Sequence, residues 1–520
     1  MTSVEVISAI FSADKWSQKS EQLDEYALAL NGSTCRPAAI VWPDSENDLK
    51  NLIQAANTHH FSLHIVAQGK NWGYGTAQAP TADQVVVNLK QMDRVLEVNE
   101  TDAYVRIQPG VTQSQLYQAI VDSGADLQLD ITAAGKHTSI VGNVLERGFG
   151  HTDYSDRFGH VLALRVLLPS GEIIETGMGA YQHSVAKHIY PYGVGPVLQG
   201  LFSQSNLGIV LEMTLALQPK PEYDLNVLIL CKNFADAPKV VCEIARLKRL
   251  GIVTSGVHTA SMARAMGAQA QKMAGAWVIT SSLSGPKTIA KARYREMKKA
   301  LKKVVPSLRF VALTERRWNL IQWVNKHLKS ELLGGLKIVW DLKKGVPTDE
   351  AIKTLLDEKS AHSHMKTAEF PAYFRWICAV TSSQPKDIKR MLGICQPLFA
   401  EFGYEERYTM TNVTERAVVL IANIRYDKTP ESLARAKAFY QTLDQALLDE
   451  GFCPYRSGSG LFDAATPYLE PNHLALLQKL KAALDPNMIL SPGKYWCGGA
   501  ASSTESSTKP THKNEVNSLI

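Results

Sequence analysis

The sequence predicts an α+β fold built from more than one domain. From residue 38 to about residue 221, short apolar strands alternate with helices and turns. From residue 226 to residue 450, long helical patterns alternate with longer strands. A proline-rich segment, Pro219–Pro221, separates the two regions and marks a domain boundary. A chain of 520 residues is long enough to form two or more such domains.

The first region predicts small sheets joined by capped helices. Residues 1–30 have an amphipathic helical pattern. A helix over 112–124 begins at a threonine cap and ends at a glycine, and a Pro-Ser-Gly-Glu turn makes residues 161–175 a β-hairpin. The other expected elements are a capped helix over 45–58 and strands over 39–41, 63–66, 85–88, 95–98, 104–107 and 208–217.

The second region predicts an antiparallel sheet with helices on one side, because its elements form two repeats of strand, helix and strand. The expected helices cover 235–250, 286–304, 385–402 and 430–450, and the clearest strands cover 226–231, 277–281 and 417–425. Residues 453–497 return to loops. The last 20 or so residues are rich in Ser, Thr, Lys and Asn and predict a disordered tail.

Composition excludes several classes of protein. The first residues lack the pattern of a signal peptide, and no apolar run of 18 residues is present, which predicts no membrane span. Seven dispersed cysteines without a CxxC pair argue against a disulfide framework or a metal site and favour a cytoplasmic protein with reduced thiols. The net charge of +6 is concentrated in residues 291–303, which predict the solvated face of one helix rather than a nucleic-acid site.

A glycine-rich loop carries the strongest single functional signal. Residues 66–75 read VAQGKNWGYG, directly after an apolar strand. Glycine lets backbone N–H groups approach an anion closely. The loop has neither the Walker spacing nor the Gly-x-Gly-x-x-Gly spacing. Because Tyr74 lies between the last two glycines, the loop predicts a pyrophosphate cofactor beside an aromatic substrate. The alternative is a tight turn between strands.

Further segments join this loop in a fixed order: Arg106–Gly110, Ser139–Asp156, Ser203–Val210 and Asp485–Lys494. Together they resemble the FAD-binding fold of the vanillyl-alcohol oxidase and para-cresol methylhydroxylase family, and most closely its branch acting on 4-alkylphenols. The segments most similar to that branch are Glu146–Gly150, Glu175–Gly179, Tyr190–Pro196 and Phe202–Val210. The resemblance covers residues 35–225 and, less strongly, 430–495.

The resemblance implies an FAD-binding domain of two subdomains (1–225), a cap domain (226–451), a C-terminal return to the FAD-binding domain (452–498) and a tail (499–520). It also implies a homodimer that passes electrons to O₂ or to an electron-carrier protein. The residues that it implies as FAD contacts are Gly69, Lys70, Asn71, Trp72, Gly73, Gly75, Pro109, Gly110, Ser139, Gly142, Asn143, Arg147, Gly148, His151, Gly208, Ile209, Val210 and Lys494.

The same resemblance implies that Tyr74, Tyr455 and Arg456 hold the oxygen of a phenolic substrate. The chemistry suits this set, because a 4-alkylphenol loses a benzylic hydride far more easily as its phenolate. Ionising a phenol of pKa near 10 at neutral pH requires about 4 kcal/mol. One arginine and two tyrosine hydroxyls in a dry pocket supply stabilisation of that order. The alternative is that Tyr455 and Arg456 only pack and form an ion pair.

Two departures from the family pattern stand out. Ala134 occupies the position where many relatives have an Asp beside flavin N5, so the acid/base group is missing. The flavin-linking residue of the cap has only Tyr373 or Cys378 as candidates, and the alternative is FAD held without a covalent bond. The expected function is abstraction of hydride from a benzylic C–H of a phenol. The alternatives are oxidation of another alcohol, amine or natural-product intermediate, and a non-catalytic binding protein on a degenerate flavin fold.

Overall fold

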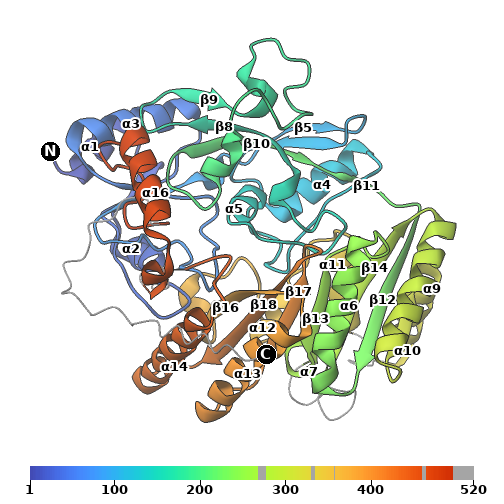
Figure 1. Ribbon diagram of the computed structural model, residues 1–520. Helices are drawn as coiled ribbons and strands as arrows, with labels where there is room; N and C mark the ends of the chain where they lie inside the picture. Colours follow the sequence, from blue (N-terminus) through green and yellow to red (C-terminus); the bar gives the residue numbers. More distant parts are fainter. Residues whose placement is uncertain (267–276, 329–333, 357, 459–463, 496–520) are drawn as a thin grey trace, which may run out of the picture.

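The computed structural model describes residues 1–520 except 267–276, 329–333, 357, 459–463 and 496–520. The tail predicted over 499–520 therefore lies outside the described residues. Figure 1 shows two parts that lie against each other: an N-terminal part of helices and small sheets, and a large sheet formed by later residues. The last helix of the chain lies back beside the first helices (Figure 1).

The first sheet of the N-terminal part has four strands in the order β1-β2-β4-β3. Strands β2 and β3 run parallel to β4, so helix α3 serves as the crossover between β2 and β3. The segment predicted as helical over 1–30 forms two helices separated by β1. The bounds are α1 (Ser3–Ile10), β1 (Trp16–Ser17), α2 (Ser20–Ala27), β2 (Ala39–Val41), α3 (Glu46–His59), β3 (Leu63–Val66), β4 (Val85–Asn88) and the 3-10 turn η1 (Leu89–Gln91).

The second sheet of this part is antiparallel, with the strand order β5-β6-β10-β8-β9. The predicted helix over 112–124 is confirmed, because Thr112 forms a capping box and Gly124 ends the helix in the left-handed conformation. The hairpin of β8 and β9 is also confirmed. The bounds are β5 (Val95–Asn99), β6 (Tyr104–Ile107), α4 (Gln113–Ser123), β7 (Leu127–Gln128), α5 (Ile140–Leu145), η2 (Phe158–His160), β8 (Val161–Leu167), β9 (Ile173–Glu175), η3 (Gly177–Ala180), η4 (Leu198–Phe202), β10 (Ile209–Ala216) and β11 (Gln218–Pro219), which pairs with β7.

The large sheet, called here the cap sheet, has seven antiparallel strands in the order β15-β12-β14-β13-β17-β18-β16. Successive side chains alternate between its two faces. One face is apolar and packs under helices α6, α9, α13 and α14, which confirms the predicted sheet with helices on one side. The strands are β12 (Tyr223–Cys231), β13 (Val257–Ser261), β14 (Trp277–Gly285), β15 (Arg309–Leu313), β16 (Tyr373–Ser382), β17 (Tyr408–Asn412) and β18 (Ala417–Tyr426).

The other face of the cap sheet carries many polar side chains and lies toward the N-terminal part. The basic residues of 291–303 lie on α9, on the opposite, outer side of the sheet. The helices and 3-10 turns of this region are η5 (Phe234–Asp236), α6 (Ala237–Arg249), α7 (Met262–Met266), α9 (Lys287–Val304), α10 (Glu315–Leu328), α11 (Gly334–Lys343), α12 (Glu350–Leu356), η8 (Thr367–Glu369), α13 (Pro385–Glu401), α14 (Pro430–Asp449) and η9 (Thr466–Tyr468).

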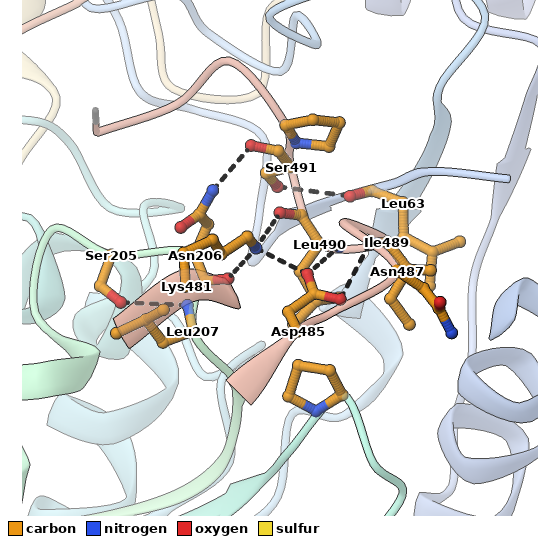
Figure 2. A network of polar contacts seen from close by, with 12 residues as sticks. Leu63, Ser205, Asn206, Leu207, Lys481, Asp485, Asn487, Ile489, Leu490 and Ser491 are labelled. Carbon is orange, nitrogen blue, oxygen red and sulfur yellow. Dashed lines mark hydrogen bonds and ion pairs between the residues drawn. The ribbon is translucent and has the colours of Figure 1, made fainter. Parts of the chain in front are cut away.

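The C-terminal return is fixed by a buried polar network (Figure 2). Helix α16 (Pro471–Leu484) carries Lys481, whose ammonium donates to Asp485 at 2.6 Å and to the carbonyl oxygens of Asn206 and Leu490, both at 2.8 Å. The amide N–H of Ser491 donates to the carbonyl of Leu63 at 2.7 Å, at the start of β3. Residues 485–491 therefore lie beside the first sheet, more than 400 residues away along the chain.

We propose the domain division that the sequence predicts, 1–225, 226–451 and 452–498. The cap sheet begins with β12 at Tyr223, close to the first of these boundaries. In the part of the chain that the structure describes, no helix is both long enough and apolar enough to cross a membrane.

Candidate active site

A cavity of about 360 Å³ lies where the N-terminal part, the cap sheet and the C-terminal return meet. Most of its lining comes from residues within 64–80, 133–146, 202–210 and 493–495. Phe374, Trp376 and Arg456 close it from the side of the cap sheet. A volume of this size is in the range of small-molecule and cofactor sites.

Most of the residues that the sequence predicts as cofactor or substrate contacts line this cavity. Gly69 and Gly75 have φ angles of +66° and +110°, so the loop follows a path that residues other than glycine adopt rarely. The predicted residues that line the cavity are Gly69, Lys70, Asn71, Trp72, Tyr74, Gly75, Pro109, Ser139, Gly142, Asn143, Gly208, Ile209, Val210, Arg456 and Lys494.

Three predicted glycines support this lining from behind. A Cβ on Gly73 would lie 2.5 Å from the ring of Trp376, and a Cβ on Gly148 would lie 2.3 Å from the amide of Asn143. A Cβ on Gly110 would lie within 2.8 Å of three backbone carbonyl oxygens. These positions need glycine for close packing, which supports the shape of the cavity.

The residues of the lining fit FAD. Glycine backbone at 69–75 forms the cradle, and Lys70 and Lys494 supply positive charge for a diphosphate. On the next segment, the hydroxyl of Ser139 accepts a hydrogen bond from the N–H of Gly142 at 2.9 Å and fixes the turn there. A partly apolar cavity with two lysines and a glycine cradle suits a dinucleotide that carries a flat apolar ring.

Tyr74 and Arg456 line the cap side of the cavity, and Tyr455 lies beside them, outside the lining. The guanidinium carbon of Arg456 lies 4.2 Å from the ring centre of Tyr74, and its Nη2 donates to Asn71 Oδ1 at 2.5 Å. Tyr455 is held by its N–H, which donates to the carbonyl of Cys378 at 3.2 Å. The hydroxyl of Tyr74 lies 2.7 Å from the Cys378 thiol. Two phenol hydroxyls and one guanidinium are thus gathered from opposite ends of the chain.

These groups keep the protonation states needed to hold an anion. Burial raises the pKa of the Tyr74 and Tyr455 hydroxyls above the ordinary tyrosine value, so both remain donors. Burial also raises the pKa of the Cys378 thiol to about 12. Burial alone lowers the pKa of Arg456, but Glu146 and the two tyrosines outweigh it, so the net shift is upward and the guanidinium stays charged. The cluster therefore presents positive charge and O–H donors.

Glu146 is a residue of this site to which the sequence reasoning gave no role. Its carboxylate lies 3.6 Å from both Arg456 Nε and Lys494 Nζ, and the hydroxyl of Tyr495 donates to it. Glu146 therefore orients the arginine and ties it to the C-terminal return. The only local signal was a charged residue at the end of the buried α5 segment, and its partners come from positions more than 300 residues later.

Tyr373 and Cys378, the two candidates for a flavin link, lie on opposite faces of the cap sheet. Tyr373 packs against the apolar core under the helices, 6.1 Å from the ring of Tyr426. Cys378 points to Tyr74 on the face toward the N-terminal part. The structure brings neither Tyr373 nor Cys378 into the lining of the cavity. The covalent link through Tyr373 stays a prediction.

The loop with Ala134 presents small apolar groups to the cavity, because Ala133 and Ala134 both line it. The nearby Asp130 does not replace the missing acid. Its Oδ1 accepts hydrogen bonds from the N–H of His151 at 3.0 Å and from Thr152, and its Oδ2 lies 3.5 Å from Arg157. This carboxylate is therefore held inside the N-terminal part.

His151 and Arg147, both predicted as FAD contacts, lie outside the cavity lining. Arg147 is exposed and donates from Nε to Ser203 at 3.0 Å. The ring of His151 stacks on His258 of β13, with centroids 4.2 Å apart. No pattern in the sequence singled out His258, which is one polar residue in a short strand.

Comparison with known proteins agrees with this site. Residues 37–177 match the model of an FAD binding domain, and residues 419–495 match that of the C-terminal domain of FAD linked oxidases. The chain is 30% identical over 496 residues to 1'-carboxy-chondrochloren decarboxylase of Chondromyces crocatus, covering 89% of this chain and 91% of that protein. It is 24% identical over 503 residues to the flavoprotein subunit of the hydroxylating 4-cresol dehydrogenase of Pseudomonas putida, covering 94% of each.

A solved structure of an FAD-linked relative also matches this chain. 4-Ethylphenol oxidase from Gulosibacter chungangensis, in complex with isoeugenol, matches with a TM-score of 0.85 and 25% identity over 96% of this chain and 97% of that one. The resemblance predicted from the glycine loops is confirmed. This chain is an FAD-linked oxidoreductase that belongs to the vanillyl-alcohol oxidase and para-cresol methylhydroxylase family.

Proposed function

We propose that the protein abstracts a hydride from the benzylic carbon of a 4-substituted phenol whose oxygen is held by Tyr74, Tyr455 and Arg456. The observation that carries this proposal is the meeting of Tyr74 and Arg456 at one end of the cavity, with Tyr455 beside them and outside the lining. The similarity to 4-ethylphenol oxidase and to 4-cresol dehydrogenase supports the same substrate class.

The three residues would bind the substrate as its phenolate. Hydrogen bonds to a charged acceptor contribute about 1.5–3 kcal/mol each, so two hydroxyls and one guanidinium offset the roughly 4 kcal/mol needed to ionise a phenol at neutral pH. Loss of hydride from the benzylic carbon of the phenolate leaves a neutral quinone methide. When bound, FAD supplies the two-electron acceptor for this hydride. Addition of water, or loss of a proton to give an alkene, then completes the reaction.

Stopped-flow absorbance with the FAD-loaded protein tests this proposal. Mixed anaerobically with 4-ethylphenol, the wild-type protein should lose its visible flavin absorption. Arg456→Ala should slow this reduction by about 100-fold, because the phenolate loses its counter-charge, and Tyr455→Phe should slow it by about tenfold, because one donor is lost.

The matched control is Tyr408→Phe, which removes a tyrosine hydroxyl from a strand of the cap sheet on the face covered by helices. This variant should reduce at the wild-type rate. Wild-type rates in both Tyr455→Phe and Arg456→Ala would rule out the phenolate clamp. Retained FAD with no reduction by any phenol would favour a non-catalytic protein.

A second candidate function is oxidative decarboxylation of a phenolic natural-product intermediate, favoured by the 30% identity to the chondrochloren decarboxylase. After hydride loss, a carboxylate on the next carbon would leave as carbon dioxide. Its bonding electron pair would return the quinone methide to a phenolate with a side-chain double bond. Mass spectrometry of the products from 4-hydroxyphenylpropanoate distinguishes this outcome, an alkene without the carboxylate, from hydroxylation at the benzylic carbon.

A further inference from the structure

The ring of His151 lies between the two parts of the molecule and has no hydrogen-bond partner among the residues that the structure describes. Its neighbour His258 is fixed at both nitrogens: Nε2 lies 3.3 Å from the carbonyl of Gly150, and Nδ1 lies 3.3 Å from the Thr411 hydroxyl. The two rings stack at 4.2 Å. Among the described residues, neither ring nitrogen of His151 makes a hydrogen bond, although its main-chain groups are bonded to Asp130 and Lys343.

The histidine pair lies next to the proposed phenol clamp. The ring of Phe149 is 5.4 Å from the ring of Tyr455 and 6.5 Å from the ring of His258. Phe149 thus separates the tyrosine that would hold the phenol oxygen from the imidazoles. A phenol bound by its oxygen would direct its 4-substituent away from the clamp.

The surroundings of the two rings are positively charged below about pH 7, where Lys343 holds its proton, because burial lowers the pKa of Lys343 to about 7. Lys343 on α11 donates to the carbonyl oxygens of His151 at 3.0 Å and of Gly256 at 2.6 Å. Within the described residues no carboxylate lies within ion-pair distance of Lys343 or of either ring. Burial, together with the positive charge of Lys343, lowers the pKa of both imidazoles, that of His258 to about 3. Both rings are therefore neutral in the free protein.

Three carboxylates near this cluster each have a contact outside it, but Oδ2 of Asp130, Oδ1 of Asp153 and both oxygens of Asp224 have no hydrogen-bond partner among the described residues. Asp130 is bonded to Thr152 and Arg157, and Asp153 accepts from the Ser284 hydroxyl at 3.2 Å. Asp224 lies 3.9 Å from Lys344. The other cation near His258 is Lys248, which donates to two backbone carbonyls. An anion that entered beside His151 would thus meet cations and a free imidazole.

We propose that His151 binds a carboxylate on the side chain of the phenolic substrate, with uptake of a proton by the imidazole as the carboxylate binds. This inference rests on the proposed phenol clamp and adds the chemical class of the substrate: a 4-hydroxyphenyl compound with an acidic side chain. An opposite charge in contact with an imidazole favours its protonated form, and burial strengthens the resulting charged hydrogen bond. His151 is thereby assigned to the substrate instead of the cofactor.

The test compares two ligands that differ only in charge, 4-hydroxyphenylpropanoate and 4-hydroxyphenylpropanamide, with the FAD-loaded protein under conditions without turnover. Titration followed by the flavin spectrum gives each Kd at about pH 6 and about pH 8, a range in which one linked proton changes affinity by about tenfold or more. The carboxylate should bind at least about tenfold more tightly at the lower pH, whereas the Kd of the amide should not change.

His151→Phe keeps the stacked ring and removes the nitrogens. This variant should lose the preference for the carboxylate by about tenfold and keep the wild-type Kd for the amide. The matched control is His160→Phe, another imidazole that stacks on an aromatic ring, that of Tyr154 at 3.9 Å. It should behave as the wild type.

Three results would overturn the inference: equal binding of both ligands by the wild type, an unchanged carboxylate preference in His151→Phe, or loss of FAD from His151→Phe alone. If 4-ethylphenol still reduces the flavin of the wild-type protein in these cases, the proposed clamp stands. If neither ligand nor 4-ethylphenol binds the wild-type protein, the proposed function itself fails.

Discussion

Two buried lysines of this molecule have opposite surroundings. Lys481 is 0% exposed, and its ammonium bonds to the carboxylate of Asp485 and to two carbonyl oxygens (Figure 2). Lys343 is 1% exposed and bonds to two carbonyl oxygens, but within the described residues it has no carboxylate at ion-pair distance. The first network is complete, and the second has a cation without a counter-charge.

The difference separates a structural ion pair from a buried lysine without a counter-ion. A buried ion pair with all its hydrogen bonds satisfied holds two segments together, and nothing further can bind to it. A buried cation without an anion lowers stability, and such groups concentrate at sites that bind or react. Lys481 therefore joins the C-terminal return to the first sheet, and Lys343 provides positive charge at the interface where His151 and His258 stack.

Breaking the complete network should have the largest effect on stability. Lys481→Met leaves the carboxylate of Asp485 buried and unpaired, which costs about 3–5 kcal/mol in the free energy of unfolding. Chemical denaturation measures this loss. Lys479→Met, an exposed lysine of the same helix, is the control and should change stability by no more than about 0.5 kcal/mol. A loss below about 1 kcal/mol for Lys481→Met would contradict the structural role.

The unpaired Lys343 should make the free energy of unfolding depend on pH. The pKa of Lys343 is lowered to about 7 from 10.5, mainly by burial. Between these values the unfolded chain holds the proton and the folded chain does not, so the stability contributed by this group rises with pH across that window and is absent below it. The wild-type free energy of unfolding should therefore rise by on the order of 1 kcal/mol per pH unit.

Lys343→Met should lack the part of this rise that Lys343 contributes, and Lys291→Met, an exposed lysine on α9, should keep it. Denaturant midpoints measured from about pH 7 to about pH 10 provide the comparison. Parallel pH profiles for the wild type and Lys343→Met would show that Lys343 stays protonated in the folded state.

The smallest expected effect on stability comes from removing one hydrogen bond to His258. Thr411→Val removes the hydroxyl that lies 3.3 Å from Nδ1 of His258 and should cost about 0.5–1.5 kcal/mol, the usual net contribution of one hydrogen bond. Thr409→Val, two residues earlier on the same strand, is the control, because no hydrogen bond of the Thr409 side chain is found among the described residues. Thermal unfolding of both variants measures the difference. Equal stability would mean that the Thr411 contact is not formed.

The fold could be predicted well where its signals are local. Thr112 and Gly124 mark the ends of α4 because a cap and a left-handed glycine depend only on neighbouring residues. The turn at 169–172 fixed the hairpin for the same reason. The pattern over 1–30 was less informative, since two short helices and one continuous helix place apolar residues at similar spacing.

The site could be predicted only where the family motif includes it. Tyr74 and Arg456 were found through their motifs, and the structure brings them together. The contact between His151 and His258 joins a loop to a strand of another sheet, and no short-range pattern encodes such a contact. Strand alternation does distinguish Tyr373 from Cys378, because residues separated by an odd number of positions point to opposite faces.

The return of the chain beside β3 has a consequence for synthesis of the protein. The cavity is lined by residues 64–76 and also by Gly493, Lys494 and Tyr495. A ribosome releases the first set long before the second, at about 5–20 residues per second. The cofactor site therefore remains open on one side until residues 493–495 have been synthesised, and stable loading of FAD has to wait for them.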